Sequence, residues 1–138
     1  MKSFIVSIIL ICFSFGYAQK SKLTPEHYQN IRKAFRDKMP DNSVAVLFSA
    51  PIRNRANDVD YVYHQDPHFF YLTGWHQPHS VILIYKNPQR DQQGSYFEKI
   101  YVPERDNYME MWNGKRYSLE HVKQLGFGRV AERKAFKA

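Results

Sequence analysis

The sequence predicts an α/β fold, and three observations support this prediction. Apolar runs of strand length occupy residues 43–49 and 80–85, and amphipathic patterns with helical spacing lie before and after them. Helices that alternate with buried strands are typical of α/β domains. Aromatic residues make up 16% of the chain, which favours a packed globular fold over disorder.

The first 18 residues predict a secretory signal peptide. Lys2 supplies the positive charge, an apolar stretch runs from Phe4 to Phe15, and Ala18 provides a small residue before a polar segment. The apolar stretch is shorter than the roughly 20 residues that span a bilayer as a helix. We therefore expect cleavage after Ala18, an exported protein that is periplasmic or secreted, and no stable membrane anchor; an uncleaved anchor is the alternative.

The mature chain, residues 19–138, is expected to form one domain without disulfides. The only cysteine, Cys12, lies in the signal segment, and Ile11 before it is too large for a lipoprotein signal. The full sequence has 20 Lys and Arg against 13 Asp and Glu, a formal net charge of +7. Because the basic residues are scattered, a solvated surface is favoured over a nucleic-acid site.

The first element after the signal segment is predicted to be an amphipathic helix. Thr24-Pro25-Glu26 combines a capping hydroxyl, a proline at the first helical position and an acid in the first turn. Apolar side chains then recur at spacings of three and four: Tyr28, Ile31, Phe35 and Met39. Basic residues fall on the opposite face: Lys33, Arg36 and Lys38. Pro40 and the polar residues after it end the helix.

The two apolar runs, residues 43–49 and 80–85, predict strands that are buried on both faces of a sheet. The segment between them begins with polar residues 52–60, which predict a loop. Asp66-Pro67 then predicts the cap of a short helical turn that carries several aromatic side chains.

The rest of the chain predicts two more strands and a helix. Residues 87–94 are typical of a polar turn, and residues 97–102 alternate in polarity, so we expect a third strand nearer an edge. Ser118 predicts the cap of a helix that ends at Gly126, and residues 127–130 predict the start of a fourth strand. Because the sequence stops where a further unit would begin, we expect the domain to be incomplete at its C-terminus.

Six histidines invite a metal site, but their context argues against one. Two pairs have the helical spacing that suits zinc: His64 with His68, and His76 with His79. A proline interrupts each pair, and no acid follows the first histidine as in a His-Glu-x-x-His motif. We therefore predict surface histidines and no metal ligand in this chain.

Other catalytic patterns are equally weak. The acid pairs Asp58/Asp60 and Glu104/Asp106 are expected to be solvated in polar loops rather than to form a carboxylate dyad. The sequence has no Gly-x-Ser-x-Gly elbow, no phosphate-binding loop and no cysteine in the mature chain. We assign no catalytic residue.

The most distinctive part of the sequence is a set of three blocks. They are Arg55–Gln65, which follows Pro51; Phe69–Gly74, which leads to Pro78 and an apolar strand; and Pro103–Asp106 continuing through Glu110–Arg116. In order and spacing these blocks resemble the N-terminal domain of the aminopeptidase P (Xaa-Pro aminopeptidase) family, which is creatinase- and prolidase-like. The resemblance extends over residues 24–130, nearly the whole mature chain.

The resemblance implies the front part of a two-domain metallopeptidase. It implies an N-terminal domain with a mixed β-sheet flanked by helices, and a C-terminal "pita-bread" domain that binds two metal ions, usually manganese. Family members remove the residue that precedes proline at the N-terminus of proline-containing peptides. The family's metal ligands are two aspartates, a histidine and two glutamates, and none of them has a counterpart in this chain.

The resemblance also implies roles for Asp58 and Trp112. In relatives that form homo-oligomers, this domain borders the active-site mouth of a neighbouring subunit, and Asp58 and Trp112 match the positions that do so. The resemblance implies substrate binding there: Asp58 would attract the N-terminal ammonium of the peptide, and Trp112 would flank the peptide beyond proline. His68 departs from the family pattern, because relatives often have an acid there. We expect this chain alone to be inactive and to serve oligomerisation and active-site access. The alternative is a stand-alone interaction module that has lost the peptidase domain.

Overall fold

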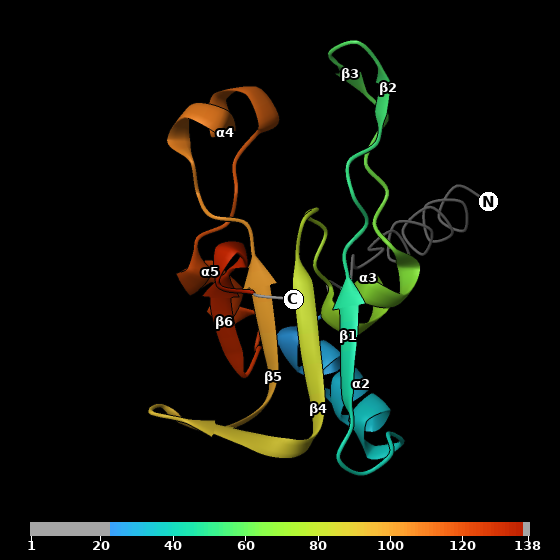
Figure 1. The fold of residues 1–138 in the computed structure, drawn as a ribbon, viewed down its shortest axis with the longest axis vertical. Helices are drawn as coiled ribbons and strands as arrows, with labels where there is room; N and C mark the ends of the chain where they lie inside the picture. Colours follow the sequence, from blue (N-terminus) through green and yellow to red (C-terminus); the bar gives the residue numbers. More distant parts are fainter. Residues whose placement is uncertain (1–22, 137–138) are drawn as a thin grey trace, which may run out of the picture.

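The structure is a computed structural model that describes residues 23–136, so the predicted signal peptide, residues 1–18, lies outside the described residues. Its helices are α2 (Pro25–Asp37), α3 (Pro67–Thr73), α4 (Asn107–Asn113), α5 (Leu119–Gln124) and the 3-10 helix η1 (Arg133–Ala135). Its strands are β1 (Val44–Phe48), β2 (Asn54–Ala56), β3 (Val59–Asp60), β4 (Val81–Asp91), β5 (Gly94–Val102) and β6 (Arg129–Glu132) (Figure 1). No helix in this part of the chain combines the length and apolar character needed to cross a bilayer.

Four strands form one mixed sheet in the order β1-β4-β5-β6. β1 pairs with β4 and β4 with β5 in antiparallel fashion, whereas β6 runs parallel to β5. The parallel pair requires a crossover, which contains α4 and α5. The α/β prediction and the mixed sheet that the resemblance implied are both confirmed.

The predicted start of α2 is confirmed. The side chain that this helix buries most deeply is not one of the predicted apolar stripe. The Thr24 hydroxyl accepts a hydrogen bond from the His27 amide at 3.4 Å, and Pro25 is the first helical residue. Arg32 is the fully buried side chain of this helix, whereas Phe35, a stripe residue, is 37% exposed. Helical spacing alone does not reveal that a charged side chain has partners inside the domain.

Arg32 connects three parts of the domain. Its Nε donates to Oε2 of Glu98 on β5 at 2.8 Å, and its Nη1 and Nη2 donate to the carbonyls of Leu72 and Gly126 at 3.2 and 2.9 Å. The guanidinium also lies over the Phe127 ring, 4.5 Å from its centroid. A buried charge is tolerated when it is paired and hydrogen-bonded in this way.

Three predictions about the strands are wrong. The strand at residues 43–49 is not buried on both faces, because β1 is an edge strand with alternating burial. The third strand is not near an edge, since β5 lies between β4 and β6. Residues 87–94 are not simply a turn, because β4 continues to Asp91 and β5 begins at Gly94. Polar side chains on a projecting two-stranded ribbon resemble a turn in sequence.

The helices α2, α3 and α5 cover one face of the sheet, and Figure 1 looks onto the other face. The covered face holds the buried core: Phe69, Leu72, Trp75, Ile82, Ile84, Ile100, Val102, Val122 and Phe127. On the open face, the outward side chains of β1 are exposed: Val44, Val46 and Phe48. Phe136 contacts Phe48 and Tyr101 there, with ring centroids 6.2 and 5.2 Å apart.

The block Phe69–Gly74 ends in a tight turn after α3. Asp66 caps this helix as predicted, with Oδ1 accepting from the Phe69 amide at 2.8 Å. Gly74 has a φ of 65°, and a Cβ there would lie 2.5 Å from the Tyr28 ring. Trp75 then turns into the core, where its Nε1 donates to Ser80 Oγ at 2.8 Å. Glycine therefore meets both a conformational and a steric requirement.

Candidate functional site

Two segments project from the same end of the sheet (Figure 1). We call residues 50–65 the hairpin arm; β2 and β3 form its tip. We call residues 103–117, which contain α4, the helical arm. Asp58 lies at the tip of the hairpin arm and Trp112 lies on α4. The structure therefore places both predicted site residues at one end of the domain, on different arms.

The tip of the hairpin arm is more ordered than the predicted loop at residues 52–60. β2 and β3 pair in antiparallel fashion, and Asn57 takes the left-handed conformation, with φ 52°, that a tight turn requires. The Asn54 side-chain amide donates to the Asn57 carbonyl at 3.0 Å and to Oδ1 of Asp60 at 3.2 Å. These bonds fix the turn that presents the exposed Asp58 carboxylate.

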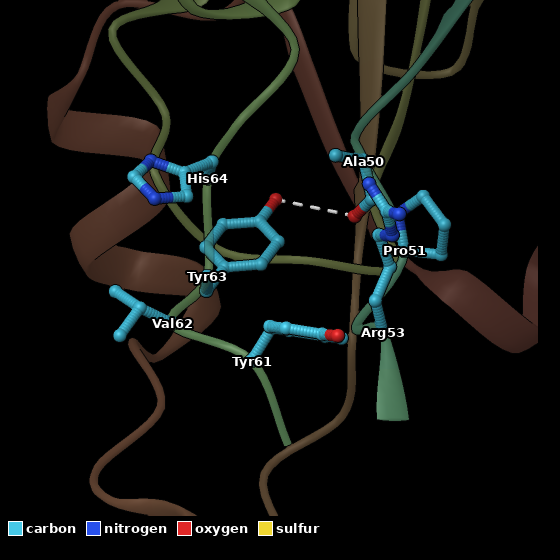
Figure 2. Close-up of a pocket in the computed structure, with 7 residues that line it drawn as sticks. All are labelled: Ala50, Pro51, Arg53, Tyr61, Val62, Tyr63 and His64. Atoms are coloured by element: carbon cyan, nitrogen blue, oxygen red, sulfur yellow. Dashed lines mark hydrogen bonds between the residues drawn. The ribbon is translucent and has the colours of Figure 1, made fainter. Parts of the chain in front are cut away.

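The stem of the hairpin arm consists of two extended segments joined by polar contacts. The Tyr61 amide donates to the Arg53 carbonyl at 2.9 Å, and the Tyr63 hydroxyl donates to the Ala50 carbonyl at 3.2 Å (Figure 2). Burial raises the pKa of Tyr63. A pocket of about 650 Å³ opens here, lined by Ala50, Pro51, Arg53, Tyr61, Val62, Tyr63 and His64.

Gln65 fastens the hairpin arm to the body of the domain. Its Oε1 accepts from the amides of Ala50 and Asp66 at 2.8 and 2.9 Å. Its Nε2 donates to the carbonyls of Trp75 and Gln77, both at 3.2 Å. One side-chain amide thus satisfies backbone groups at the start of the arm, at its end and in the turn after α3.

The helical arm is organised around Glu110. The Arg105 guanidinium binds this carboxylate through two hydrogen bonds of 2.9 and 3.0 Å, and the Arg116 amide donates to Oε1 at 3.2 Å. The hydrogen bonds from Arg105 hold the pKa of Glu110 below its ordinary value. This ion pair joins Arg105, which precedes the short helix α4, to Glu110 within that helix.

α4 presents large apolar side chains to solvent. Trp112 is 74% exposed, and Tyr108 and Met111 are exposed beside it. The arm returns to the core at Tyr117, whose ring lies 5.5 Å from Trp75 and stacks on His121 at 4.4 Å. An exposed cluster of this kind on a braced arm is typical of a contact surface.

The bases of the two arms meet above the end of the sheet. The Gln77 side chain donates to the Lys115 carbonyl at 3.3 Å. Beside this bond lies a smaller pocket of about 160 Å³, lined by Ile52, Gln77, Pro78, Pro103, Gly114, Lys115 and Arg116. The two arms are therefore linked through Gln77, whose carbonyl accepts a hydrogen bond from Gln65 of the hairpin arm at 3.2 Å.

The histidines do not gather into a metal site. Within residues 23–136, no three His, Cys, Asp or Glu side chains lie close enough together to hold a metal ion. His76 instead contacts the rings of Tyr63 and Phe70 edge-on, at 5.7 and 5.8 Å. The metal pair that the resemblance implies therefore has no fitting ligand set among the described residues.

Sequence reasoning identified the exposed residues of the arms and missed the residues that hold them. Gln65 and Glu110 both lie within the blocks that carry the resemblance. Their partners, however, are mainly backbone groups and an arginine whose positions only the fold establishes. The sequence places Gln65 and Glu110 within these blocks, but that position does not indicate what either side chain binds.

Comparison with known proteins places this architecture in one family. Residues 28–135 match the model of the aminopeptidase P N-terminal domain. An intermediate cleaving peptidase 55 from Schizosaccharomyces pombe is 37% identical over 111 residues, which cover 78% of this chain and 22% of that protein. A Xaa-Pro aminopeptidase from Haemophilus influenzae is 34% identical over 107 residues, covering 78% and 24%.

Solved structures agree. Aminopeptidase P from Escherichia coli in a low-pH form has a TM-score of 0.71 and 28% identity, covering 83% of this chain and 25% of that one. Proline aminopeptidase P II from Yersinia pestis has a TM-score of 0.69 and 32% identity, and the match covers 80% of this chain and 25% of that one. The chain spans about a quarter of the length of the relatives it matches. The two-arm domain described above therefore belongs to the aminopeptidase P family, as an N-terminal domain.

Proposed function

We propose that this chain is the non-catalytic N-terminal domain of an exported Xaa-Pro aminopeptidase, and that its two arms border the active site of a neighbouring subunit. The observation that carries this proposal is the pair of exposed arms, each fastened by a dedicated polar side chain, that present Asp58 and Trp112 at one end of the domain. Relatives named as Xaa-Pro aminopeptidases supply the reaction class.

The two side chains suit complementary parts of a peptide substrate. The exposed Asp58 carboxylate at the hairpin tip would attract the N-terminal ammonium of the peptide. The flat, exposed indole of Trp112 would pack beside the residues after proline. Neither group performs bond cleavage. In this proposal the two manganese ions and the activated water belong to the part of the protein that follows residue 138.

A homo-oligomer is part of the proposal. An arm that projects away from its own sheet is suited to reach a second subunit, and a mouth bordered by arms admits short peptides more readily than folded proteins. Export follows from the predicted signal peptide, and cleavage after Ala18 would leave no stable membrane anchor. The scattered basic residues give no reason to add nucleic acid to the partners.

The first experiment is to read the coding DNA beyond the codon for Ala138. We expect an open frame of a few hundred residues with two aspartates, a histidine and two glutamates at pita-bread spacing. The longer protein should hydrolyse Xaa-Pro peptides with manganese. A stop codon at that point would overturn the peptidase assignment and direct attention to an interaction module that uses the same arms.

The second experiment tests the arms in the longer protein. Asp58→Asn and Trp112→Ala should each lower kcat/KM for Xaa-Pro peptides about tenfold, equivalent to about 1.4 kcal/mol of lost transition-state binding. Tyr71→Ala, at an exposed aromatic residue on α3, is the matched control and should leave kcat/KM unchanged. Unchanged kinetics in both arm variants would contradict the proposal.

A further inference from the structure

A groove lies between α2, α3 and β1, and none of the residues that line it belongs to either arm. Its volume is about 650 Å³, which falls within the range of small-molecule sites. Leu72 is buried, whereas Phe35 is 37% and Tyr71 is 63% exposed, so the groove is open to solvent. All three elements contribute apolar side chains to it: Ile31, Phe35, Leu47, Tyr71 and Leu72. A concave apolar surface of this kind is typical of a binding site.

One face of α2 forms the long wall of this groove. The residues of that face recur with helical spacing: His27, Asn30, Ile31, Ala34, Phe35 and Lys38. From His27 to Lys38 the wall is roughly 17 Å long, at about 1.5 Å of rise per residue. Phe35, a member of the predicted apolar stripe, therefore lines the groove rather than the core. The wall has an apolar centre and polar ends, which suits an elongated ligand with one polar end.

The two ends of the wall differ in charge. Lys38 lies at the C-terminal end of α2, and among the described residues it forms no ion pair and donates no side-chain hydrogen bond. The negative end of the helix dipole is offset there, because Lys86 Nζ donates to two carbonyls of the last helical turn at 3.3 and 3.0 Å. At the other end, the exposed Glu26 lies next to His27 in sequence. An anionic group is therefore favoured near Lys38 and disfavoured near His27.

The composition of the lining favours a small anionic molecule over a macromolecular partner. No acidic side chain is among the described residues that line the groove, and Lys38 is the one lysine or arginine there. A bilayer surface is usually bound by clusters of about four to eight lysines and arginines, so a single lysine is better suited to one free anion. The α2 wall of a second copy would bring another Lys38 against the first, and the full chain has a formal net charge of +7. Like charges therefore disfavour a second copy of this wall as the occupant.

We propose that this groove binds a free long-chain carboxylate, with its anionic head at Lys38 and its apolar body against Phe35 and Leu72. The ammonium of Lys38 would bind the carboxylate by charge-assisted hydrogen bonds. Burial of the apolar body against α2, α3 and β1 would supply most of the affinity, because the head binds at an exposed position. The site goes beyond the proposed function, since it lies outside the arms and takes no part in peptide cleavage.

Three probes separate the contributions of head and body. Isothermal titration calorimetry of the longer protein would compare dodecanoate below its critical micelle concentration with dodecanol and with acetate. We expect saturable one-to-one binding of dodecanoate, about fivefold weaker binding of dodecanol, which lacks the charge, and no measurable binding of acetate, which lacks the apolar body. Equal affinity for dodecanoate and dodecanol would overturn the role of Lys38. Binding to anionic phospholipid vesicles without binding to free dodecanoate would overturn the proposal in favour of a membrane surface.

Variants assign the binding to this groove. Lys38→Gln should bring the affinities for dodecanoate and dodecanol close to each other. Ala34→Phe places a ring in the middle of the α2 wall at an exposed position, so it should abolish binding of both without changing the circular dichroism spectrum. Lys33→Gln is the matched control, because Lys33 pairs with Asp37 at 2.8 Å and does not line the groove. Dodecanoate binding that survives both Ala34→Phe and Lys38→Gln unchanged would overturn the proposal, and this result would not depend on Xaa-Pro hydrolysis.

Discussion

The helix-covered layer and the two arms are built on opposite principles. In the layer beneath α2, α3 and α5, large side chains are fully buried, and among the described residues every buried side-chain nitrogen and oxygen has a hydrogen-bond partner. In the arms, most side chains are exposed, and each arm depends on one polar residue, Gln65 or Glu110. The layer therefore supplies the stability of the domain. The arms hold exposed side chains in fixed places through a few polar contacts, without burying any of the residues that the structure describes in them.

The two tryptophans give the largest expected contrast. Trp75 is 2% exposed and hydrogen-bonded in the core, whereas Trp112 is 74% exposed on α4. Trp75→Ala should lower the free energy of unfolding by about 3–5 kcal/mol because it leaves a large cavity. Trp112→Ala should change it by less than about 0.5 kcal/mol. Urea unfolding of the two variants measures both, and similar losses would erase the distinction between layer and arm.

The buried ion pair tests whether the layer depends on polar contacts as well as packing. Arg32→Met leaves the Glu98 carboxylate without its partner, so we expect a loss of about 3–5 kcal/mol in the free energy of unfolding. Replacing both residues, as Arg32→Met with Glu98→Leu, should recover much of this loss because no buried charge remains. Lys33→Met, which removes an exposed pair with Asp37, is the control and should have little effect. An Arg32→Met variant as stable as this control would show that the pair is dispensable.

Gln65 lies at the junction of the two regions, and its loss should have an intermediate effect. Gln65→Leu keeps the size of the side chain but leaves the Ala50 amide and the Trp75 carbonyl without their bonds. We expect a loss of about 1–3 kcal/mol in the free energy of unfolding. Faster hydrogen exchange at residues 50–65 should accompany it. Gln93→Leu, in the distal β4–β5 turn, should change neither quantity, and a uniform increase in exchange across the sheet would contradict a local role for Gln65.

The helical arm should be the first part to loosen in acid. Hydrogen bonds from Arg105, together with the Arg116 amide and nearby positive charge, hold the pKa of Glu110 below its ordinary value of 4.5. The stabilisation is therefore complete above pH 4.5 and is lost as the pH falls below it, through the lowered pKa of the folded state. NMR at decreasing pH should show resonances of residues 105–116 changing before those of β4. In Glu110→Gln these residues should be loosened at every pH, and an unchanged acid transition in that variant would assign it to another group.

The sequence predicts the features that depend on local contacts and misses those that depend on contacts between distant segments. Caps and helical spacing gave α2, α3 and α5, because those signals are local: Thr24 and Asp66 bond to amides three residues away. The edge position of β1 and the central position of β5 depend on pairing between distant segments, which no local pattern encodes. The burial of Arg32 has the same origin, since Glu98 lies 66 residues away.

The arms show this limit most clearly. Asp58 and Trp112 were found through resemblance to a family, not from their own chemistry. Their location on separate arms at one end of the sheet followed from the topology alone. Gln65 and Glu110 could not be assigned from the sequence, because a glutamine or glutamate in a polar segment is most often solvated. Only the positions of their backbone and arginine partners distinguish them.

The open face of the sheet has a practical consequence for anyone who handles this chain in isolation. Val44, Val46 and Phe48 expose their side chains on a strand whose outer edge is also unpaired within the described residues. Such a surface attracts hydrophobic dyes and offers a template for adding another strand. The concentration at which the purified domain stays monodisperse will therefore be set by β1, and Val46→Lys is the substitution that should raise it.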